Sequence, residues 1–326
     1  MSILEIKNLS VNYEVDSGII KAVENISFSI DKGETLAIVG ESGCGKSTTA
    51  HALMRLISKP GVIANGSIEL DGLDLTKLKE KEMSKIRGKD MAMIFQEPMT
   101  SLNPVYKVGE QIAETIRIHT GQNRSQALSQ AIKIMDKVGI SNPATRAKQY
   151  PHQMSGGMRQ RAMIAMALAC EPKVLIADEP TTALDVTIQA QILRLMRKLQ
   201  KDFNTAILFI THDLGVVAEV ADKVAVMYCG NIVEVGPVVD IYYSPKHPYT
   251  KGLIESVPDV SKKMGRLCQI EGTVPSTDNM PEGCKFYPRC NYATDNCRDK
   301  FPNLNKLGEH KVACFNPISA AKEVAK

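Results

Sequence analysis

The hydrophobic pattern of the chain predicts a mixed α/β fold. Residues 4–13 and 26–30 alternate apolar and polar positions, as half-buried antiparallel strands do. Continuous apolar runs predict strands that are covered on both faces. These runs lie at residues 35–39, 91–95, 174–177, 206–210 and 224–228, and a shorter strand is expected at residues 66–72. Helices are expected over residues 46–57, 157–169 and 186–201.

Two stretches depart from this alternation of strands and helices. Over residues 98–158 the strand patterns stop, and apolar residues recur at helical spacing. We interpret this stretch as a helical subdomain inserted into an α/β domain of residues 1–240. Residues 241–326 are rich in Pro and Cys and show little periodicity. We therefore expect an irregular, Cys-rich C-terminal extension that a large hydrophobic core does not hold together.

Composition and charge exclude several classes of protein. The 326 residues are 44% hydrophobic and 23% charged, which is typical of about two globular domains and not of a disordered chain. Aromatic residues make up only 5%, so binding to single-stranded nucleic acid by stacking is disfavoured. The net charge of +4 is typical of an ordinary solvated surface. No apolar stretch approaches the ~20 residues of a membrane helix, and the N-terminus has no hydrophobic leader. We expect a cytoplasmic protein that reaches a membrane only through partners.

Residues 40–48 carry a glycine-rich phosphate loop. They follow a buried strand, open a helix and fit the pattern G-x-x-x-x-G-K-[ST]. Glycines let backbone N–H groups converge on phosphate oxygens, Lys46 adds a mobile positive charge, and Ser47 offers a hydroxyl to Mg²⁺. The expected nucleotide-binding residues are Gly40, Ser42, Gly43, Cys44, Gly45, Lys46, Ser47 and Thr48.

Two acidic residues end a buried strand further along the chain. Asp178 and Glu179 follow the apolar run 174–177, and adjacent carboxylates at such a position are costly unless a cation meets them. We expect Asp178 to join Ser47 in the Mg²⁺ shell. Glu179 is expected to orient and deprotonate an attacking water molecule.

Two further polar residues follow buried strands. Parallel α/β sheets bind ligands at the carboxyl ends of their strands, so His212 and Gln96 are expected at the same edge as Glu179. His212 would hydrogen-bond a terminal phosphate and align Glu179 with the water. Gln96 would reach Mg²⁺ or the water and so report the phosphate state to the inserted helices.

A second phosphate-binding element is predicted at residues 154–158. Ser155 is a natural helix N-cap, and Gly156 and Gly157 leave backbone N–H groups open in front of an apolar helix. One subunit needs one phosphate loop, so this element suggests a grip on another subunit's nucleotide. The alternative is an ordinary capped helix.

The cysteines concentrate near the C-terminus. Cys284, Cys290, Cys297 and Cys314 form a C-x5-C-x6-C-x16-C pattern in a segment without a large core. In a reducing compartment this clustering favours a metal site over disulfides. The spacing leaves a Zn²⁺ site, an iron–sulfur cluster and free thiols as alternatives.

Together these motifs resemble the ATP-binding cassette (ABC) ATPases across residues 1–240. The matching segments are the Walker A loop 40–48, the Q-loop residue Gln96, the signature 154–158, the Walker B strand 174–179, the D-loop 182–185 and the switch residue His212. The resemblance implies a P-loop ABC nucleotide-binding domain, with a RecA-like core, an antiparallel β subdomain and the inserted helices. It also implies MgATP hydrolysis by a head-to-tail dimer.

In such a dimer each ATP lies between one subunit's Walker A loop and the signature of the other. Tyr13 matches the aromatic residue that stacks on adenine, and Asp185 matches the D-loop aspartate. The signature departs from the usual LSGGQ, because Met154 and Met158 replace Leu and Gln. Ser155 and both glycines remain, so the signature should still bind the phosphate of the partner's nucleotide. Met158 lacks the amide with which the usual Gln contacts ribose or adenine.

The resemblance narrows to the ATPases of dipeptide and oligopeptide importers. It rests on Ser155–Arg161, on Ala177–Thr187, on the stretch His247–Thr250, on Glu271–Pro275 and on the Cys284…Cys290 segment. This family implies a related but different ATPase as dimer partner, two membrane permeases, and a peptide-binding protein outside the membrane. It places the subunit on the inner face of the cell membrane and implies a [4Fe–4S] cluster on the four cysteines, with Zn²⁺ as the alternative.

Other functions are weighed against this one. An importer of nickel or another small solute uses the same type of ATPase. A soluble ABC protein acting on nucleic acid, with the tail as a zinc module, usually has two cassettes in one chain, and a second cassette is missing here. A regulatory nucleotide switch is disfavoured by the retention of Glu179 and His212.

Overall fold

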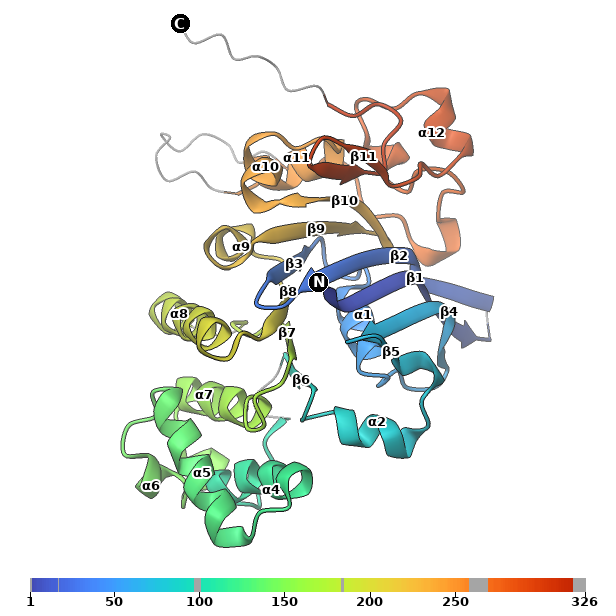
Figure 1. The fold of residues 1–326 in the computed structure, drawn as a ribbon. Helices are drawn as coiled ribbons and strands as arrows, with labels where there is room; N and C mark the ends of the chain where they lie inside the picture. Colours follow the sequence, from blue (N-terminus) through green and yellow to red (C-terminus); the bar gives the residue numbers. More distant parts are fainter. Residues whose placement is uncertain (1, 17, 97–100, 183–184, 258–268, 319–326) are drawn as a thin grey trace, which may run out of the picture.

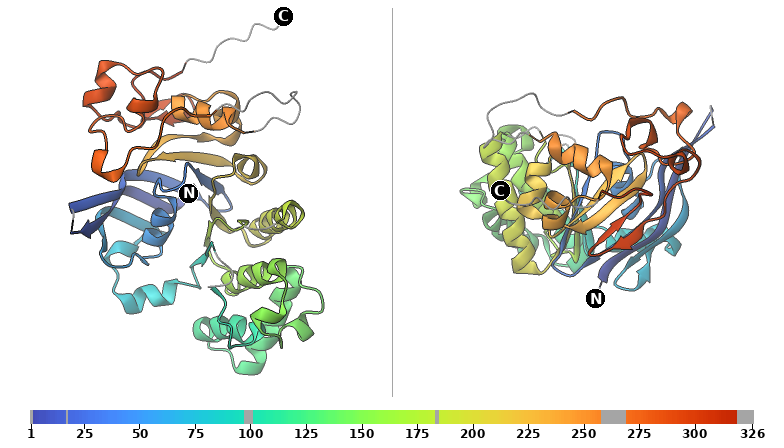
Figure 2. Two further views of the ribbon diagram at one scale, coloured as in Figure 1. Left: turned by 180° about the vertical axis from the view of Figure 1, so that it is seen from behind. Right: turned by 90° about the horizontal axis from the view of Figure 1, so that it is seen from above.

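The computed structural model of the protein describes residues 2–16, 18–96, 101–182, 185–257 and 269–318. Two sheets and a group of helices make up this part of the chain (Figure 1). In Figures 1 and 2 the helices α4–α6 and the C-terminal extension lie at opposite ends of the molecule, with the two sheets between them. None of the described helices is both long enough and apolar enough to cross a membrane.

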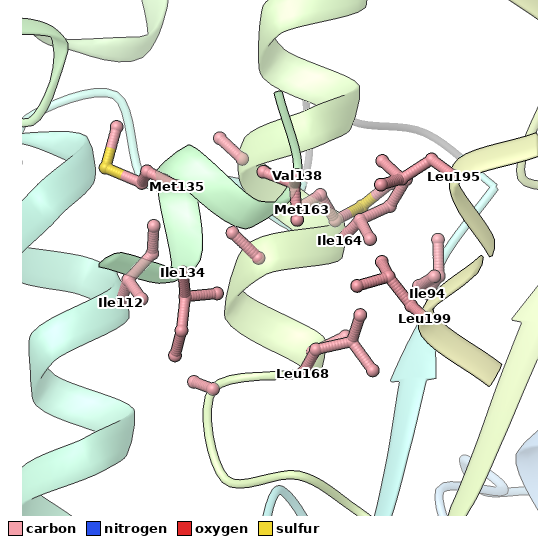
Figure 3. Close-up of a cluster of buried hydrophobic side chains, with 14 of the residues drawn as sticks. Ile94, Ile112, Ile134, Met135, Val138, Met163, Ile164, Leu168, Leu195 and Leu199 are labelled. Atoms are coloured by element: carbon pink, nitrogen blue, oxygen red, sulfur yellow. The ribbon is translucent and has the colours of Figure 1, made fainter. Parts of the chain in front are cut away.

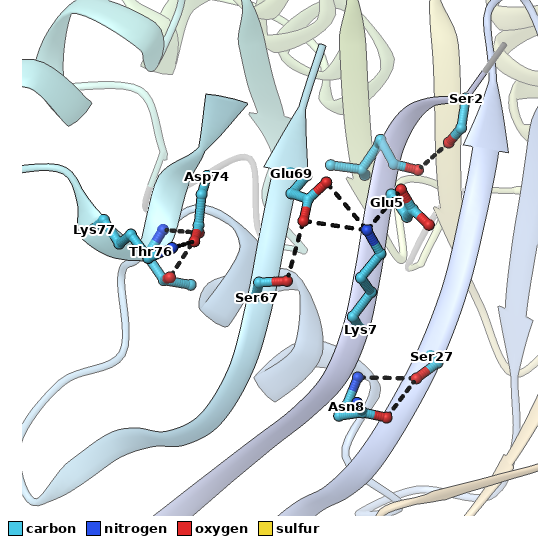
Figure 4. A network of polar contacts seen from close by, with 11 residues as sticks. Ser2, Glu5, Lys7, Asn8, Ser27, Ser67, Glu69, Asp74, Thr76 and Lys77 are labelled. Atoms are coloured by element: carbon cyan, nitrogen blue, oxygen red, sulfur yellow. Dashed lines mark hydrogen bonds and ion pairs between the residues drawn. The ribbon is translucent and has the colours of Figure 1, made fainter. Parts of the chain in front are cut away.

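A four-stranded antiparallel sheet has the order β2-β1-β4-β5. Its strands are β1 (Ser2–Val15), β2 (Gly18–Asp31), β4 (Gly61–Leu70) and β5 (Leu73–Asp74). One face is buried, and the other carries polar side chains, as the alternating pattern predicts. On this face Lys7 Nζ lies 3.1 Å from a carboxylate oxygen of Glu5 on the same strand, β1, and 3.2 Å from Glu69 Oε1 on the neighbouring strand β4 (Figure 4).

An eight-stranded sheet has the order β11-β12-β10-β9-β3-β8-β7-β6. Its strands are β3 (Thr35–Val39), β6 (Met91–Ile94), β7 (Val174–Asp178), β8 (Ala206–Ile210), β9 (Lys223–Tyr228), β10 (Asn231–Pro237), β11 (Asn305–Leu307) and β12 (His310–Val312). Neighbouring strands from β9 to β6 are parallel, whereas β10, β11 and β12 pair antiparallel. All five continuous apolar runs are strands of this sheet, which confirms those predictions.

The described helices are α1 (Lys46–Leu53), α2 (Glu80–Ile86), α4 (Val108–Thr120), α5 (Arg124–Lys137), α6 (Pro143–Arg146), α7 (Gly156–Ala167), α8 (Val186–Phe203), α9 (Leu214–Val220), α10 (Val238–Tyr243), α11 (Pro248–Glu255) and α12 (Asp295–Asp299). Short 3-10 turns occur at η1 (Leu75–Lys77), η2 (Pro151–Gln153), η3 (Thr277–Asn279) and η4 (Tyr287–Arg289). Helix α1 ends earlier than predicted, and Arg55 just beyond it has a positive φ of 50°.

Helices α4, α5, α6 and α7 lie between β6 and β7 in the chain, where the sequence predicts inserted helices. The apolar faces of α4, α5 and α7 belong to a core that continues under the sheet and α8 (Figure 3). Ile112, Met135 and Ile164 of α4, α5 and α7 are buried in it together with Leu199 of α8. This shared core couples the helices to the sheet edge that carries β6 and β7.

The C-terminal extension has more regular structure than the sequence predicts. It begins within α10 and contains α11, α12 and the hairpin β11–β12, and β12 pairs with β10 of the main sheet. The strands are three residues long, too short for a periodicity to be recognised. A third core, formed by β9, α9 and the extension, buries Tyr228, Tyr249 and Phe286. Aromatic packing therefore helps to hold a segment for which we expected no sizeable core.

Candidate nucleotide site

The phosphate loop connects β3 to α1, as predicted. Gly40, Gly43 and Gly45 have φ values of 157°, 78° and 103°, which only glycine adopts readily. At Gly40 a Cβ atom would lie 2.1 Å from the carbonyl oxygen of Met227 in β9. The start of the loop therefore requires glycine for backbone geometry and for its close approach to the neighbouring strand.

Lys46 and the start of α1 supply positive potential to this loop. The Nζ of the buried Lys46 donates to the carbonyl oxygens of Gly40, at 2.8 Å, and of Glu41, at 3.0 Å. Gly45 is the N-cap of α1 and provides no side-chain cap for the first N–H groups of the helix. Uncapped N–H groups and a lysine at a helix N-terminus form a site suited to phosphate.

Asp178 is the last residue of β7 and reaches the same loop. Its side chain is 2% exposed, and its Oδ1 accepts a hydrogen bond from Ser47 Oγ at 3.2 Å. Burial raises the pKa of this carboxyl, and the hydrogen bond from Ser47 opposes that rise. A buried carboxylate beside a hydroxyl is an oxygen donor set that fits Mg²⁺, so the residues present suit that ion.

Glu179 is held by three side chains. Its Oε2 accepts hydrogen bonds from Gln96 Nε2, at 3.1 Å, and from Thr182 Oγ1, at 2.9 Å, while its Oε1 lies 3.0 Å from His212 Nδ1. Partial burial alone would raise the pKa of this carboxyl, but the hydrogen bonds from His212 and Thr182 and the charge of Lys46 lower it below its ordinary value. Glu179 is therefore an ionised carboxylate at neutral pH, as a base for water must be.

The predicted residues converge on one cavity at the carboxyl ends of the parallel strands. The cavity has a volume of about 210 Å³. Its lining comprises Ala22, Ser42, Gly43, Gly45, Lys46, Ser47, Thr48, Gln96 and Glu179. His212 joins it through Glu179, and Asp178 through Ser47.

Three predicted nucleotide-binding residues, Gly40, Cys44 and Tyr13, lie outside this lining. The side chain of Cys44 is buried in the core, 3% exposed, and its Sγ lies 3.7 Å from Lys46 Nζ. Tyr13, in β1, packs half-buried against the same core and close to Gly61. Tyr13 does not line the phosphate-loop cavity.

The signature segment lies apart from this cavity. Ser155 is the N-cap of α7 and accepts a hydrogen bond from the Met158 amide at 3.3 Å, as predicted. Met154 is buried, and Gly157 lies against Ile188 of α8, where a Cβ atom would be 3.1 Å from the Ile188 side chain. None of residues 154–158 lines the phosphate-loop cavity of its own chain.

The structure describes Thr182 and Asp185 of the predicted D-loop, and Ala183 and Leu184 lie outside the described residues. Asp185 is the N-cap of α8, and its Oδ1 accepts a hydrogen bond from the Ile188 amide at 3.0 Å. Thr182 was not predicted as a site residue. Its contact with Glu179 depends on a turn in which the Thr182 amide donates to the Glu179 carbonyl oxygen.

The four predicted cysteine ligands line one small cavity of about 10 Å³, together with residues that include His247 and Phe286. Burial raises the pKa of Cys284 to about 11 and that of Cys314 to about 12, so these thiols are protonated at neutral pH. Within the described ranges, no group of three or more His, Cys, Asp or Glu side chains is arranged to hold a metal ion. The donor chemistry suits a metal, but this arrangement of the thiols gives the predicted metal site no support.

Comparison with known proteins places this geometry in a family. Residues 23–182 match the family model described as "ABC transporter", and residues 233–297 match "Oligopeptide/dipeptide transporter, C-terminal region". Among solved structures, the dimeric ATP-binding cassette MJ0796, in a post-hydrolysis state bound to ADP and Pi, is 26% identical with a TM-score of 0.65. That similarity covers 72% of this chain and 98% of MJ0796.

The fold and the site thus define an ABC-type ATPase, an ATP hydrolase. Over 322 residues the chain is 49% identical to the dipeptide transport ATP-binding protein DppD of Escherichia coli strain K12, covering 98% of both chains. Over 317 residues it is 51% identical to the oligopeptide transport ATP-binding protein AppD of Bacillus subtilis strain 168, covering 96% of both. The chain belongs to the family of dipeptide and oligopeptide transport ATP-binding proteins.

Proposed function

We propose that this chain is the ATP-hydrolysing subunit of an importer that takes up dipeptides or oligopeptides. The observation that carries the proposal is the convergence of the phosphate loop, Gln96 and Glu179 on one cavity. The substrate class is supported by the names of DppD and AppD and by the match of residues 233–297 to a peptide-transporter region.

Different residues of the chain bind the phosphates, hold the metal ion and activate the attacking water. The backbone of residues 40–48 and Lys46 bind the phosphates, and Ser47, Asp178 and Gln96 would hold Mg²⁺. The metal would neutralise charge on the phosphate oxygens. Glu179 deprotonates the attacking water, and His212 fixes the orientation of Glu179. Tyr13 is proposed to contact adenine.

Assembly follows from the position of the signature. We propose a head-to-tail dimer with a second, related ABC ATPase, in which Ser155, Gly156, Gly157 and Met158 contact the partner's nucleotide and Asp185 lies at the interface. The dimer would bind two permeases on the inner face of the cell membrane, supplied by an extracytoplasmic peptide-binding protein. Nucleic acid has no part in this function. Residues 1–240, with 98–158 inserted, would form the ATPase domain, and residues 241–326 the extension.

For the extension we propose a [4Fe–4S] cluster on Cys284, Cys290, Cys297 and Cys314, with Zn²⁺ as the alternative. The proposal rests on the spacing of the four cysteines along the chain. They line one cavity, but their side chains are not arranged around a metal position in the described residues. Binding would require thiolates in place of the protonated thiols. Iron, sulfide and zinc analysis of the full chain purified without oxygen tests it, and a chain without all three would contradict it.

The transport function is tested by uptake of a labelled dipeptide into cells that lack this chain. Wild-type protein should restore uptake, and Lys46→Ala should not, because the phosphates lose their mobile cation. Ni²⁺ uptake is measured in the same cells. Restoration of Ni²⁺ uptake without dipeptide uptake would support the small-solute alternative and contradict peptide import.

A further inference from the structure

The C-terminal extension contacts the phosphate loop directly at Glu41. Arg289 Nη1 lies 2.7 Å from Glu41 Oε2, and Arg289 Nη2 lies 3.1 Å from Glu41 Oε1, which is a bidentate ion pair between residues 248 positions apart. The Arg289 side chain is 4% exposed. Bidentate pairs that are shielded from water are much stronger and better oriented than ordinary surface pairs.

A second contact fixes the backbone of the same loop residue. The Glu41 amide donates a hydrogen bond to Tyr249 Oη at 2.9 Å. The Tyr249 ring is fully buried and lies 4.5 Å from the Tyr228 ring and 5.4 Å from the Phe286 ring, measured between centroids. The first turn of the phosphate loop is therefore attached to a packed aromatic cluster that belongs largely to the extension.

The position of Arg289 depends in turn on the cysteine-bearing segment. Arg289 ends the turn η4, between Cys284 and Cys290, and its Nε donates to the carbonyl oxygen of Glu271 at 3.0 Å. The Cys284 amide donates to the carbonyl oxygen of Cys297 at 2.8 Å. The same short segment thus carries the cysteines and the guanidinium that reaches the nucleotide site.

The negative charge of Glu41 would oppose phosphate binding, and Arg289 neutralises it. A carboxylate beside a loop that binds phosphates repels them, because like charges in a partly buried site are weakly screened. Pairing with Arg289 cancels this charge and holds the side chain away from the loop backbone that must face the phosphates. Lys46 also donates to the Glu41 carbonyl oxygen, so a shift of Glu41 would disturb the lysine as well.

We infer that the C-terminal extension positions the phosphate loop, with Arg289 as a positioning residue that acts through Glu41. This inference rests on the proposed binding of MgATP to residues 40–48. It gives the extension a role in nucleotide affinity that is separate from any contact with membrane subunits. A corollary is that loss of structure around Cys284 and Cys290 weakens ATP binding.

The test measures binding of a non-hydrolysable ATP analogue with Mg²⁺ to the full-length chain by calorimetry. Arg289→Met should raise the Kd about tenfold, and added salt should narrow the difference from wild type, because salt screens the uncompensated Glu41 charge. Glu41→Gln keeps the loop backbone and leaves the Arg289 charge unpaired, so it should lower the Kd, and Glu41→Gln combined with Arg289→Met should return the Kd to within about threefold of wild type. Arg298→Met, an exposed arginine of the same extension, is the matched control and should bind like wild type.

A purely structural role for Arg289 would make the double variant bind as weakly as Arg289→Met, and that result overturns the inference. Equal Kd values for Arg289→Met and wild type overturn it as well. If thermal unfolding shows that Arg289→Met does not fold, the Kd values of Tyr249→Phe and Glu41→Gln test the inference in its place. Loss of the Tyr249 hydroxyl should weaken binding, and a Glu41→Gln variant that binds more weakly than wild type contradicts the charge argument. The proposed function fails separately, when wild type does not bind or Lys46→Ala binds equally well.

Discussion

Replacement of the proposed base Glu179 by Gln should separate catalysis from binding at this site. Glu179 accepts hydrogen bonds from Gln96 and Thr182 on one oxygen and contacts His212 Nδ1 with the other. A glutamine of the same shape can keep its oxygen toward Gln96 and Thr182 and turn its amide toward a His212 nitrogen that accepts. The variant should therefore fold, with a stability change of at most about 1 kcal/mol.

The expected loss is confined to the chemical step. A positioned general base contributes about 10²- to 10⁴-fold, so kcat should fall by that factor, equivalent to a barrier about 3–5 kcal/mol higher. The KM for ATP should stay within about threefold of wild type, because the variant removes a negative charge near the phosphates and no group that binds them. A fall in kcat with little change in KM is expected when a group acts only in the transition state.

The assay is phosphate release by the full-length chain under multiple- and single-turnover conditions, beside nucleotide binding. Thr182→Val is the matched control: it removes one hydrogen bond to Glu179 but retains the base, so its kcat should fall about tenfold at most. A Glu179→Gln variant that turns over within about threefold of wild type would refute the reasoning, because the carboxylate would then not be the base. A parallel loss of binding would also refute it.

Three further predictions concern the loop and the metal-facing carboxylate. Burial raises the pKa of Asp178 above 3.8, so the free energy of unfolding falls as the pH rises from 3.8 through the folded-state pKa. Asp178→Asn should therefore raise the free energy of unfolding of the nucleotide-free chain at neutral pH by about 1 kcal/mol, measured by urea unfolding. The same variant should lose Mg²⁺-dependent turnover. Gly40→Ala places a Cβ atom 2.1 Å from the Met227 carbonyl oxygen, so the KM for ATP should rise at least about tenfold. Gly121→Ala is the control, because a Cβ atom there has no neighbour within 4 Å, and its KM for ATP should equal that of wild type. Cys44 is 3% exposed, and burial raises the pKa of its thiol, so iodoacetamide should modify it about a hundredfold more slowly in the folded than in the unfolded chain.

The sequence predicted the strands of the main sheet well because each is covered on both faces. A strand such as β8 is five apolar residues in succession, all buried, and no other element of that length needs such a run. Short elements were harder to predict. Helix α9 has seven residues and directly follows a site motif, and β12 has three residues that pair with β10. Their formation depends on partners distant in the chain, which a local pattern does not reveal.

The parts of the site that consist of short sequence motifs could be predicted. The phosphate loop and the strand-end residues Gln96, Glu179 and His212 were expected at one edge, and the structure brings them together. The contacts of Thr182 and Arg289 were not predicted. Each depends on how a turn or a tail folds back over the loop, and spacing along the chain carries no information about such a contact.

One buried contact links the signature helix α7 to the segment that carries Glu179. Gln160 of α7 donates through its Nε2 to the carbonyl oxygen of Pro180, the residue that follows Glu179. Ser155 caps the same helix α7. In the proposed dimer Ser155 binds the partner's nucleotide while Glu179 serves the chain's own. A displacement of α7 when Ser155 engages phosphate would therefore be transmitted through Gln160 to the loop that holds the catalytic carboxylate, because a buried hydrogen bond that breaks leaves two unsatisfied groups.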